Sequence, residues 1–543
     1  MRSLRVLVSC GPAWLAACVA PEPPAPRPAG DERPATETIG FRSSWELDGS
    51  RTYRTAFDEG DTYGAKDAPR PVLMNLWYPA RAGAAAEPMP HGGYLELPSS
   101  DPRFARLAAE LAEYERGVLA TELLGRAEEE LSAEDQGRLE EVLQAPTGCV
   151  RDAAPAEGPF PLVVYHAGAG SSFEDDAYLC EELARHGYVV AGSSYLRADG
   201  SSFGIDGRAG SARDMTFLVA RARELPFVDW TRVALVGHSA GAQAILRCAG
   251  EPDCPADALV LLDTTQDYYV LDYPMHAALV TAVTAGIEHL DQRLLVAAGP
   301  EACFQLCDRL VHADRTYLTV PDLDHNEYIE QGHLHNALDL ARGRTVTPAD
   351  AKRIPAARAR YETLCADVRL FLDAALRGDE AAFAARMDEL ARHPLGGPEP
   401  CVERVPRGTD GPPPYDPASD EPPTPRQLGP LIQSAGAEST AAILARFQER
   451  EPRSPIYDSS MLTGSLLFTL VEGGQESDAR ALHAYLRTIR PEVLGLFTFA
   501  IDVSRAVGRV EDARRFARAG LTLEPENAEL QSRARELELQ PGS

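Results

Sequence analysis

The sequence carries, at residues 233–242, the segment Val-Ala-Leu-Val-Gly-His-Ser-Ala-Gly-Ala. Four apolar residues run directly into a Gly-x-Ser-x-Gly pattern, and residues 242–248 that follow are good helix formers. A strand, tight turn and helix of this kind hold the central serine on a strained backbone with its hydroxyl exposed. The glycines at 237 and 241 allow the helix to pack closely against the strand. The segment therefore predicts that Ser239 is a nucleophile rather than a structural turn residue.

Apolar runs of strand length lie on both sides of this segment and alternate with segments of helical pattern. Strands that are apolar throughout and alternate with helices form a mostly parallel sheet with helices on both faces. The sequence therefore predicts an α/β fold. The site of such a sheet lies beyond the carboxyl ends of its strands. The apolar runs are residues 71–79, 160–165, 188–192, 233–236, 258–263, 293–299 and 316–320.

A serine hydroxyl becomes a good nucleophile when a histidine takes its proton and an acid orients that histidine. In hydrolases with this kind of turn the chain order is serine, acid, histidine. His325, on the loop after the last apolar run, is the predicted base. Asp263, at the end of the run that follows the turn, is the predicted acid, with Glu301 after the next run as the alternative. His333 and His335 follow an apparent helix start and are expected to be solvated surface residues.

Residues 166–170 read His-Ala-Gly-Ala-Gly and follow a predicted buried strand. Small residues at such a position allow backbone N–H groups to approach a substrate oxygen. The predicted oxyanion donors are the backbone N–H groups of Ala240 and Gly168. No cofactor is predicted, and neither the cysteine spacing nor the His-x-His pair favours a metal site.

Residues from about 70 to 330 resemble the platelet-activating-factor acetylhydrolase and dienelactone hydrolase branch of the α/β-hydrolases. The resemblance implies the α/β-hydrolase fold and, because the acetylhydrolases place their acid after this earlier strand, favours Asp263 over Glu301. Two departures are His166-Ala167 where His-Gly is usual and Gly241-Ala242 where Gly-Gly is frequent; neither removes a backbone donor. The matching pieces are residues 76–79, the 162–172 segment, residues 187–190, the 237–241 turn, Asp263, and His325-Asn326.

The resemblance implies a serine esterase that acts on small acyl esters or acyl-phospholipids through an acyl-enzyme. Two alternatives remain: a non-catalytic scaffold that binds a protein partner through the helical tail, and a peptidase or amidase with the same three residues. The net charge of −29 argues against nucleic acid as a partner.

The amino-terminal residues predict export to a bacterial cell envelope. Arg2 and Arg5 precede a short apolar stretch, so residues 1–17 are expected to be a signal peptide. Residues 15–18 read Leu-Ala-Ala-Cys, which resembles a bacterial lipobox and implies that Cys18 is lipidated and attaches the protein to a membrane. An ordinary signal peptide with a chance cysteine is the alternative. Residues 18–35 are Pro-rich and predict an extended tether.

The rest of the chain divides by composition. Residues 36–392 are the predicted hydrolase domain, with a helical insertion at 95–145 that is either a cap over the site or a solvated decoration. Residues 393–429 are rich in Pro, Gly and charge and predict a linker. Residues 430–540 have helical periodicity, and parts of them resemble tetratricopeptide repeats. Eight cysteines follow Cys18, and their pairing cannot be read from the sequence.

Overall fold

The computed structural model describes residues 38–538, apart from 53–68, 82–86, 98, 100, 196–207, 342–346, 348, 453, 491–492 and 507. The signal peptide, Cys18 and the tether lie outside these residues. No helix in the described part of the chain is long and apolar enough to span a bilayer.

Ten strands form one sheet in the order β10-β9-β8-β7-β6-β4-β5-β2-β1-β3. The six strands from β5 to β9 in this order are parallel, while β10, β2 and β1 pair antiparallel with β9, β5 and β2. The strands are β1 (Ile39–Thr52), β2 (Pro69–Pro79), β3 (Cys149–Arg151), β4 (Phe160–His166), β5 (Val189–Gly192), β6 (Val228–His238), β7 (Ala258–Leu262), β8 (Arg293–Ala298), β9 (Arg315–Thr319) and β10 (Cys401–Val405).

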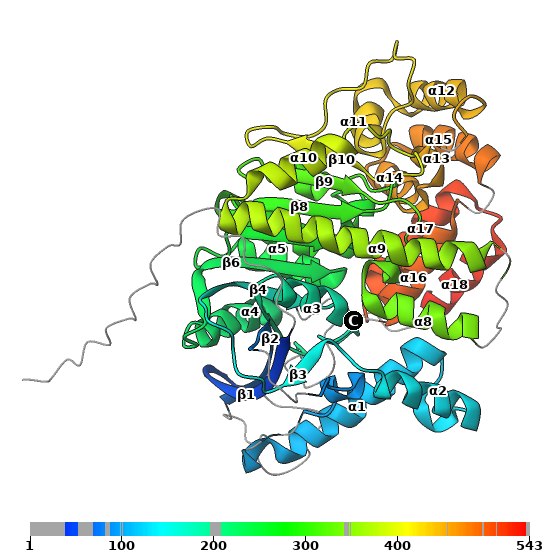
Figure 1. Cartoon of the computed structure of the whole chain (residues 1–543). Coiled ribbons are helices and arrows are strands. Elements are labelled where there is room, and N and C mark those ends of the chain that lie inside the picture. The colour runs from blue at the N-terminus through cyan, green and yellow to red at the C-terminus, as the bar shows by residue number, and fades with distance from the viewer. Residues whose placement is uncertain are drawn as a thin grey trace, which may run out of the picture.

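Helices cover both faces of the sheet, as the uniformly apolar strands predict (Figure 1). One face packs against α4 (Arg208–Ala222), α5 (Ala240–Ala249) and α6 (Ala277–Ala285). The other packs against α3 (Ala177–Arg185), α9 (Asp350–Leu372) and α10 (Glu380–Leu390). The predicted α/β-hydrolase fold is therefore confirmed: a mostly parallel sheet with helices on both faces, followed by a helical C-terminal region.

The remaining helical elements of this region lie in the connections after β7, β8 and β9, except η9, which continues directly from α9. They are η5 (Thr265–Tyr268), η6 (Pro274–His276), η7 (Ile287–His289), α7 (Gln305–Asp308), η8 (His325–Tyr328), α8 (Glu330–Ala341) and the π-helical turn η9 (Asp373–Arg377). The predicted insertion, residues 95–145, contains η2 (Pro102–Phe104), α1 (Ala105–Leu124), η3 (Glu128–Glu130) and α2 (Ala133–Gln144), and η1 (His91–Tyr94) lies just before it.

Part of the predicted linker belongs to the sheet. Within residues 393–429, Cys401–Val405 form β10, which pairs antiparallel with β9 and closes that edge. For these five residues the linker prediction is wrong. The reason is that β10 is an edge strand with two exposed charged side chains, Glu403 and Arg404, so it lacks the apolar run of the central strands.

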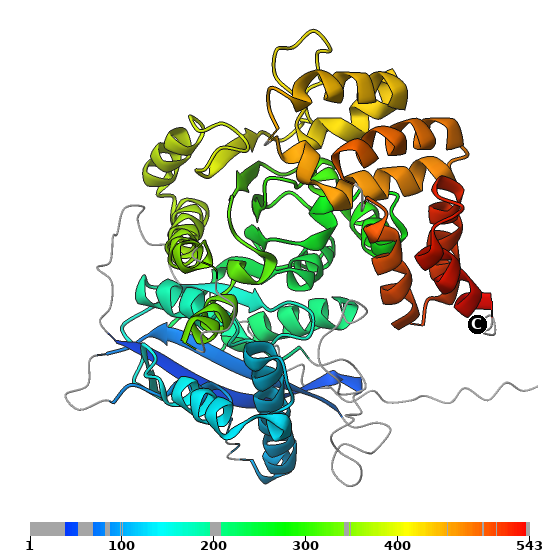
Figure 2. The same ribbon diagram turned by 90° about the vertical axis from the view of Figure 1, so that its right-hand side faces the viewer.

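The C-terminal helices lie together on one side of the sheet, coloured yellow to red in Figure 2. Their apolar core is shared with the loop after β7, because Tyr269, Val270 and Tyr273 are buried in the same cluster as Leu467 and Phe516. The Val270 backbone N–H also donates to Ser465 Oγ at 3.2 Å. The helices are α11 (Pro425–Ala435), α12 (Ala437–Gln448), α13 (Pro455–Asp458), α14 (Ser460–Glu472), α15 (Glu476–Ile489), α16 (Gly495–Ala506), α17 (Val510–Leu523) and α18 (Ala528–Glu538).

Candidate active site

Ser239 occupies a strained turn between β6 and α5. Its backbone angles are φ 54° and ψ −121°, a conformation that residues with a side chain rarely adopt. A Cβ on Gly241 would lie 2.3 Å from the carbonyl oxygens of His166 and Ala167, and one on Gly237 would lie 2.8 Å from the Gly241 carbonyl carbon. Only glycine therefore allows strand, turn and helix to approach this closely. The close approach brings the loop after β4 against the serine.

His325 lies at the start of η8, on the loop that follows β9. Its Nε2 is 3.0 Å from Ser239 Oγ, and its Nδ1 is 2.6 Å from Asp263 Oδ2. Since an ionised carboxylate only accepts, Nδ1–H donates to Asp263 and Nε2 is left to accept from the serine hydroxyl. Asp324 and Glu327 form a capping box at the start of η8, which fixes the backbone that carries the imidazole.

Asp263 follows β7 directly and has a positive φ of 42°. Its backbone N–H donates to the Ala297 carbonyl at 2.7 Å, and its Oδ1 accepts from the Tyr268 hydroxyl. That hydroxyl in turn accepts from the Gly299 N–H at 2.7 Å. The structure thus brings Asp263 to the imidazole, whereas the Glu301 carboxylate lies against Gly299.

Both predicted oxyanion donors border the serine. Ala240 is the first residue of α5, so its N–H has no acceptor within the helix. Gly168 lines the same pocket as Ser239, and a Cβ added to it would lie 3.3 Å from Ser239 Cβ. The Ser239 N–H itself is occupied, because it donates to the Leu262 carbonyl at 2.9 Å.

His238 is a supporting residue that the sequence pattern did not single out. Burial, with the neighbouring His325 second, lowers its pKa well below the usual value, so the ring is neutral. Its Nε2–H donates to the His325 carbonyl at 3.0 Å and ties the loop of the base to the serine turn. The motif leaves this position variable, so only the folded arrangement shows the contact.

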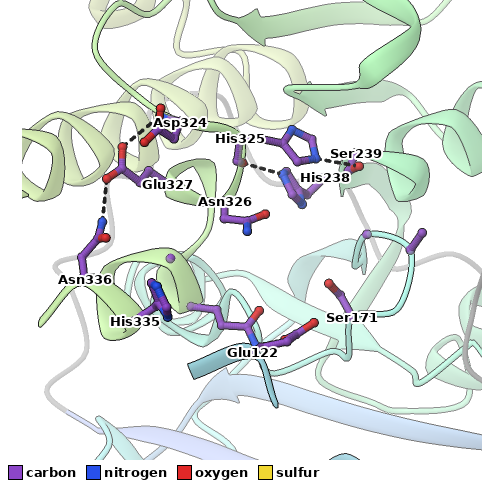
Figure 3. A pocket seen from close by; sticks show the side chains of 14 residues that line it. Glu122, Ser171, His238, Ser239, Asp324, His325, Asn326, Glu327, His335 and Asn336 are labelled. Carbon is purple, nitrogen blue, oxygen red and sulfur yellow. Dashed lines mark hydrogen bonds between the residues drawn. The ribbon is translucent and has the colours of Figure 1, made fainter. Parts of the chain in front are cut away.

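A pocket of about 680 Å³ opens in front of Ser239 and His325. Figure 3 shows Glu122 and His335 on the far side of it from these two residues. The described side chains that line it are polar or small, and they include no Leu, Ile, Val, Met, Phe, Tyr or Trp. The lining residues are Glu122, Gly168, Ala169, Ser171, His238, Ser239, Asp324, His325, Asn326, Glu327, Gln331, Gly332, His335 and Asn336.

The helical insertion contributes one wall of this pocket through Glu122, near the end of α1. The Gln331 amide of α8 donates to the Glu122 carboxylate, and His335 Nδ1 donates to the Leu123 carbonyl at 3.0 Å. The prediction of a solvated side chain is wrong for His333, whereas the side chain of His335 is 41% exposed, as predicted. His333 is buried, with Nε2 2.9 Å from the Glu327 carbonyl, and His335 lines the pocket. His333 differs from the prediction because its ring packs against Tyr361 of α9, with the ring centroids 4.8 Å apart.

The described residues contain no group of three or more His, Cys, Asp or Glu side chains arranged to hold a metal ion. The eight described cysteines are free thiols, although Cys248 and Cys254 bring their sulfurs to 3.9 Å.

No family model matches this chain, and no curated protein matches it. Among solved structures, the chain is similar to a ferulic acid esterase from Streptomyces cinnamoneus, with a TM-score of 0.39 and 19% identity. The alignment covers 64% of this chain and 92% of that one. A likeness this distant carries no information about substrate.

Proposed function

We propose that this protein is a serine hydrolase that cleaves carboxylic esters through an acyl-enzyme. One observation carries the proposal: an unbroken chain of hydrogen bonds runs from Ser239 Oγ to His325 Nε2 at 3.0 Å and from His325 Nδ1 to Asp263 Oδ2 at 2.6 Å. These residues come from the ends of three different strands, and this geometry is what acyl transfer by a serine requires.

In the proposed reaction, Ser239 Oγ attacks the ester carbonyl carbon while His325 Nε2 takes the hydroxyl proton. Asp263 holds the imidazole in the required tautomer and stabilises the imidazolium. The N–H groups of Ala240 and Gly168 stabilise the oxyanion, each by about 3–4 kcal/mol. The proton then passes from His325 to the leaving alkoxide. Water repeats the sequence on the acyl-enzyme and releases the acid.

A fluorophosphonate probe tests this proposal because it reacts only with an activated serine. We expect stoichiometric labelling of the tryptic peptide that contains Ser239, and none in Ser239→Ala. Ser434→Ala, which changes a serine on α11 far along the chain, is the matched control and should label like the wild type. Absence of labelling in correctly folded wild-type protein would overturn the proposal.

A substrate pair separates ester from amide cleavage. We expect turnover of p-nitrophenyl acetate that falls by roughly 10⁶-fold in Ser239→Ala, and little turnover of an acetylated alanine p-nitroanilide. Faster cleavage of the anilide would instead favour a peptidase or amidase.

We also propose that Cys18 is lipidated and holds the protein at a bacterial membrane. The support is the Leu-Ala-Ala-Cys segment at residues 15–18 and the Pro-rich residues after it. Metabolic labelling with an alkynyl fatty acid should mark the wild type and not Cys18→Ala. The tetratricopeptide resemblance of the tail and a protein partner for it stay predictions.

A further inference from the structure

The pocket in front of Ser239 is lined by three carboxylates: Glu122, Asp324 and Glu327. Two of them face a cation. Arg353 Nη1 lies 2.8 Å from both Glu327 oxygens, and its Nη2 lies 3.6 Å from Asp324 Oδ2. Arg353 therefore offsets the charge on the His325 side of the pocket.

Glu122, on the opposite wall, is different. Its contact in the structure is with the uncharged Gln331 amide, and no described Arg or Lys forms an ion pair with it. Burial raises the pKa of Glu122 to about 7. An ionised carboxylate at this position is stabilised most by a positive charge that arrives with a ligand.

The side chains behind Glu122 are also acidic. Glu115 of α1, and Glu174 and Asp175 of the loop after β4, are buried acids whose pKa values burial raises, to about 7 for Glu174. Electrostatic repulsion couples all three to Glu122 or to one another. Glu174 Oε2 is fully buried without a hydrogen-bond partner among the described atoms. A cation bound at this wall would lower the pKa of these acids and favour their ionised forms, whereas an anion would raise their pKa further.

We propose that the ester cleaved at Ser239 carries an organic cation, such as an ammonium group, and that Glu122 binds this cation across the pocket. The inference rests on the proposed ester-hydrolase function and narrows its substrate class. A polar lining argues against a long acyl chain, because such a chain needs apolar side chains to cover it. A metal ion is a poorer occupant, since the donor set does not form a metal-binding group within the described residues.

Two pairs of near-isosteric esters test the charge on either side of the ester bond. Acetylcholine and 3,3-dimethylbutyl acetate place it on the alcohol, and ethyl 6-aminohexanoate and ethyl heptanoate place it on the acyl group. Hydrolysis is followed by pH-stat at pH 8.5, where Glu122 is ionised. We expect kcat/KM for the cationic member of one pair to exceed that of its neutral partner at least about tenfold, because only the cationic member is attracted electrostatically to the ionised Glu122 carboxylate.

In Glu122→Gln this ratio should fall to within about threefold of one. Glu113→Gln removes an exposed carboxylate from the same helix, so it should keep the wild-type ratio. A wild-type ratio near one in both pairs, or an unchanged ratio in Glu122→Gln, would overturn the inference. Hydrolysis of the neutral esters with Ser239 labelling would then leave the proposed function standing. If none of the four esters is cleaved and Ser239 is not labelled, the proposed function itself fails.

A measurement on the wild type covers the case in which Glu122→Gln does not fold. n-Butylammonium should slow fluorophosphonate labelling of Ser239 several-fold, and n-butanol at the same concentration should not. Equal effects of the two compounds would contradict a cation site.

Discussion

Tyr268→Phe removes one hydroxyl and tests how the acid is held. That hydroxyl donates to Asp263 Oδ1 and accepts from the Gly299 N–H at 2.7 Å, while Asp263 Oδ2 faces His325. The bond therefore keeps the carboxylate plane in line with the imidazole. A hydrogen bond to a charged group contributes about 1.5–3 kcal/mol.

If losing this hydrogen bond raises the activation free energy by the same amount, each 1.4 kcal/mol lowers the rate tenfold. We therefore expect kcat/KM for p-nitrophenyl acetate to fall between about 10- and 100-fold. This is well short of the roughly 10⁴-fold expected for Asp263→Asn, which loses the correct tautomer. The acid limb of the pH–rate profile should also move, because the carboxylate that faces His325 has changed.

Tyr273→Phe is the matched control on the same loop. The Tyr273 hydroxyl is buried without a hydrogen-bond partner among the described residues, so its removal should leave kcat/KM and the pH–rate profile within about twofold of wild type. If Tyr268→Phe behaves like Tyr273→Phe in both measurements, the hydroxyl does not position Asp263 and the reasoning is refuted.

Three further predictions concern packing and charge. Gly241→Ala places a methyl group 2.3 Å from two backbone carbonyl oxygens of the loop after β4, so that loop must shift; we expect over 100-fold loss of esterase activity, measured by single-turnover kinetics. Because the folded-state pKa of Glu122 is raised from 4.5 to about 7, its contribution to stability is greatest at low pH and is lost as the pH rises through that window. Urea unfolding at pH 4.5 and 8 should show this fall reduced in Glu122→Gln by up to roughly 3 kcal/mol; an unchanged pH dependence would contradict it. Arg426→Met leaves buried Asp308 without its 2.7 Å ion-pair partner and should cost about 3–5 kcal/mol of unfolding free energy. Arg407→Met, which breaks an exposed pair, should cost under about 1 kcal/mol.

The central sheet and the serine turn could be predicted because their signal is local. Residues 233–242 combine an apolar run, a required glycine pair and a helix former within ten positions, and each constraint acts on near neighbours. The flanking parallel strands are buried on both faces, so each is a continuous apolar run. The residues alone favour Asp263 but leave Glu301 open, since the two follow adjacent strands and the distance to His325 depends on the fold; the resemblance strengthens the choice of Asp263.

The residues that surround and position the catalytic side chains could not be predicted from the sequence. Tyr268, His238 and Glu122 act through contacts with residues far away in the sequence, and nothing in their own neighbourhoods distinguishes them from packing or surface residues. Glu122 in particular is one of four glutamates on α1, and its sequence neighbourhood does not single it out from the other three. Its place in the pocket follows from how α1 meets α8, which is a tertiary contact without a sequence motif.

The shared core between the loop after β7 and the C-terminal helices has a consequence for synthesis of the protein. Val270 bonds to Ser465, 195 residues further on, and Tyr269 and Tyr273 are covered by the same helices. Domains generally fold amino-terminal part first as the chain leaves the ribosome. Ser239 and His325 can thus reach their positions before the C-terminal helices have packed against the loop beside Asp263. Full hydrolytic competence should therefore emerge late in translation, after the helices near residues 460–523 have been made.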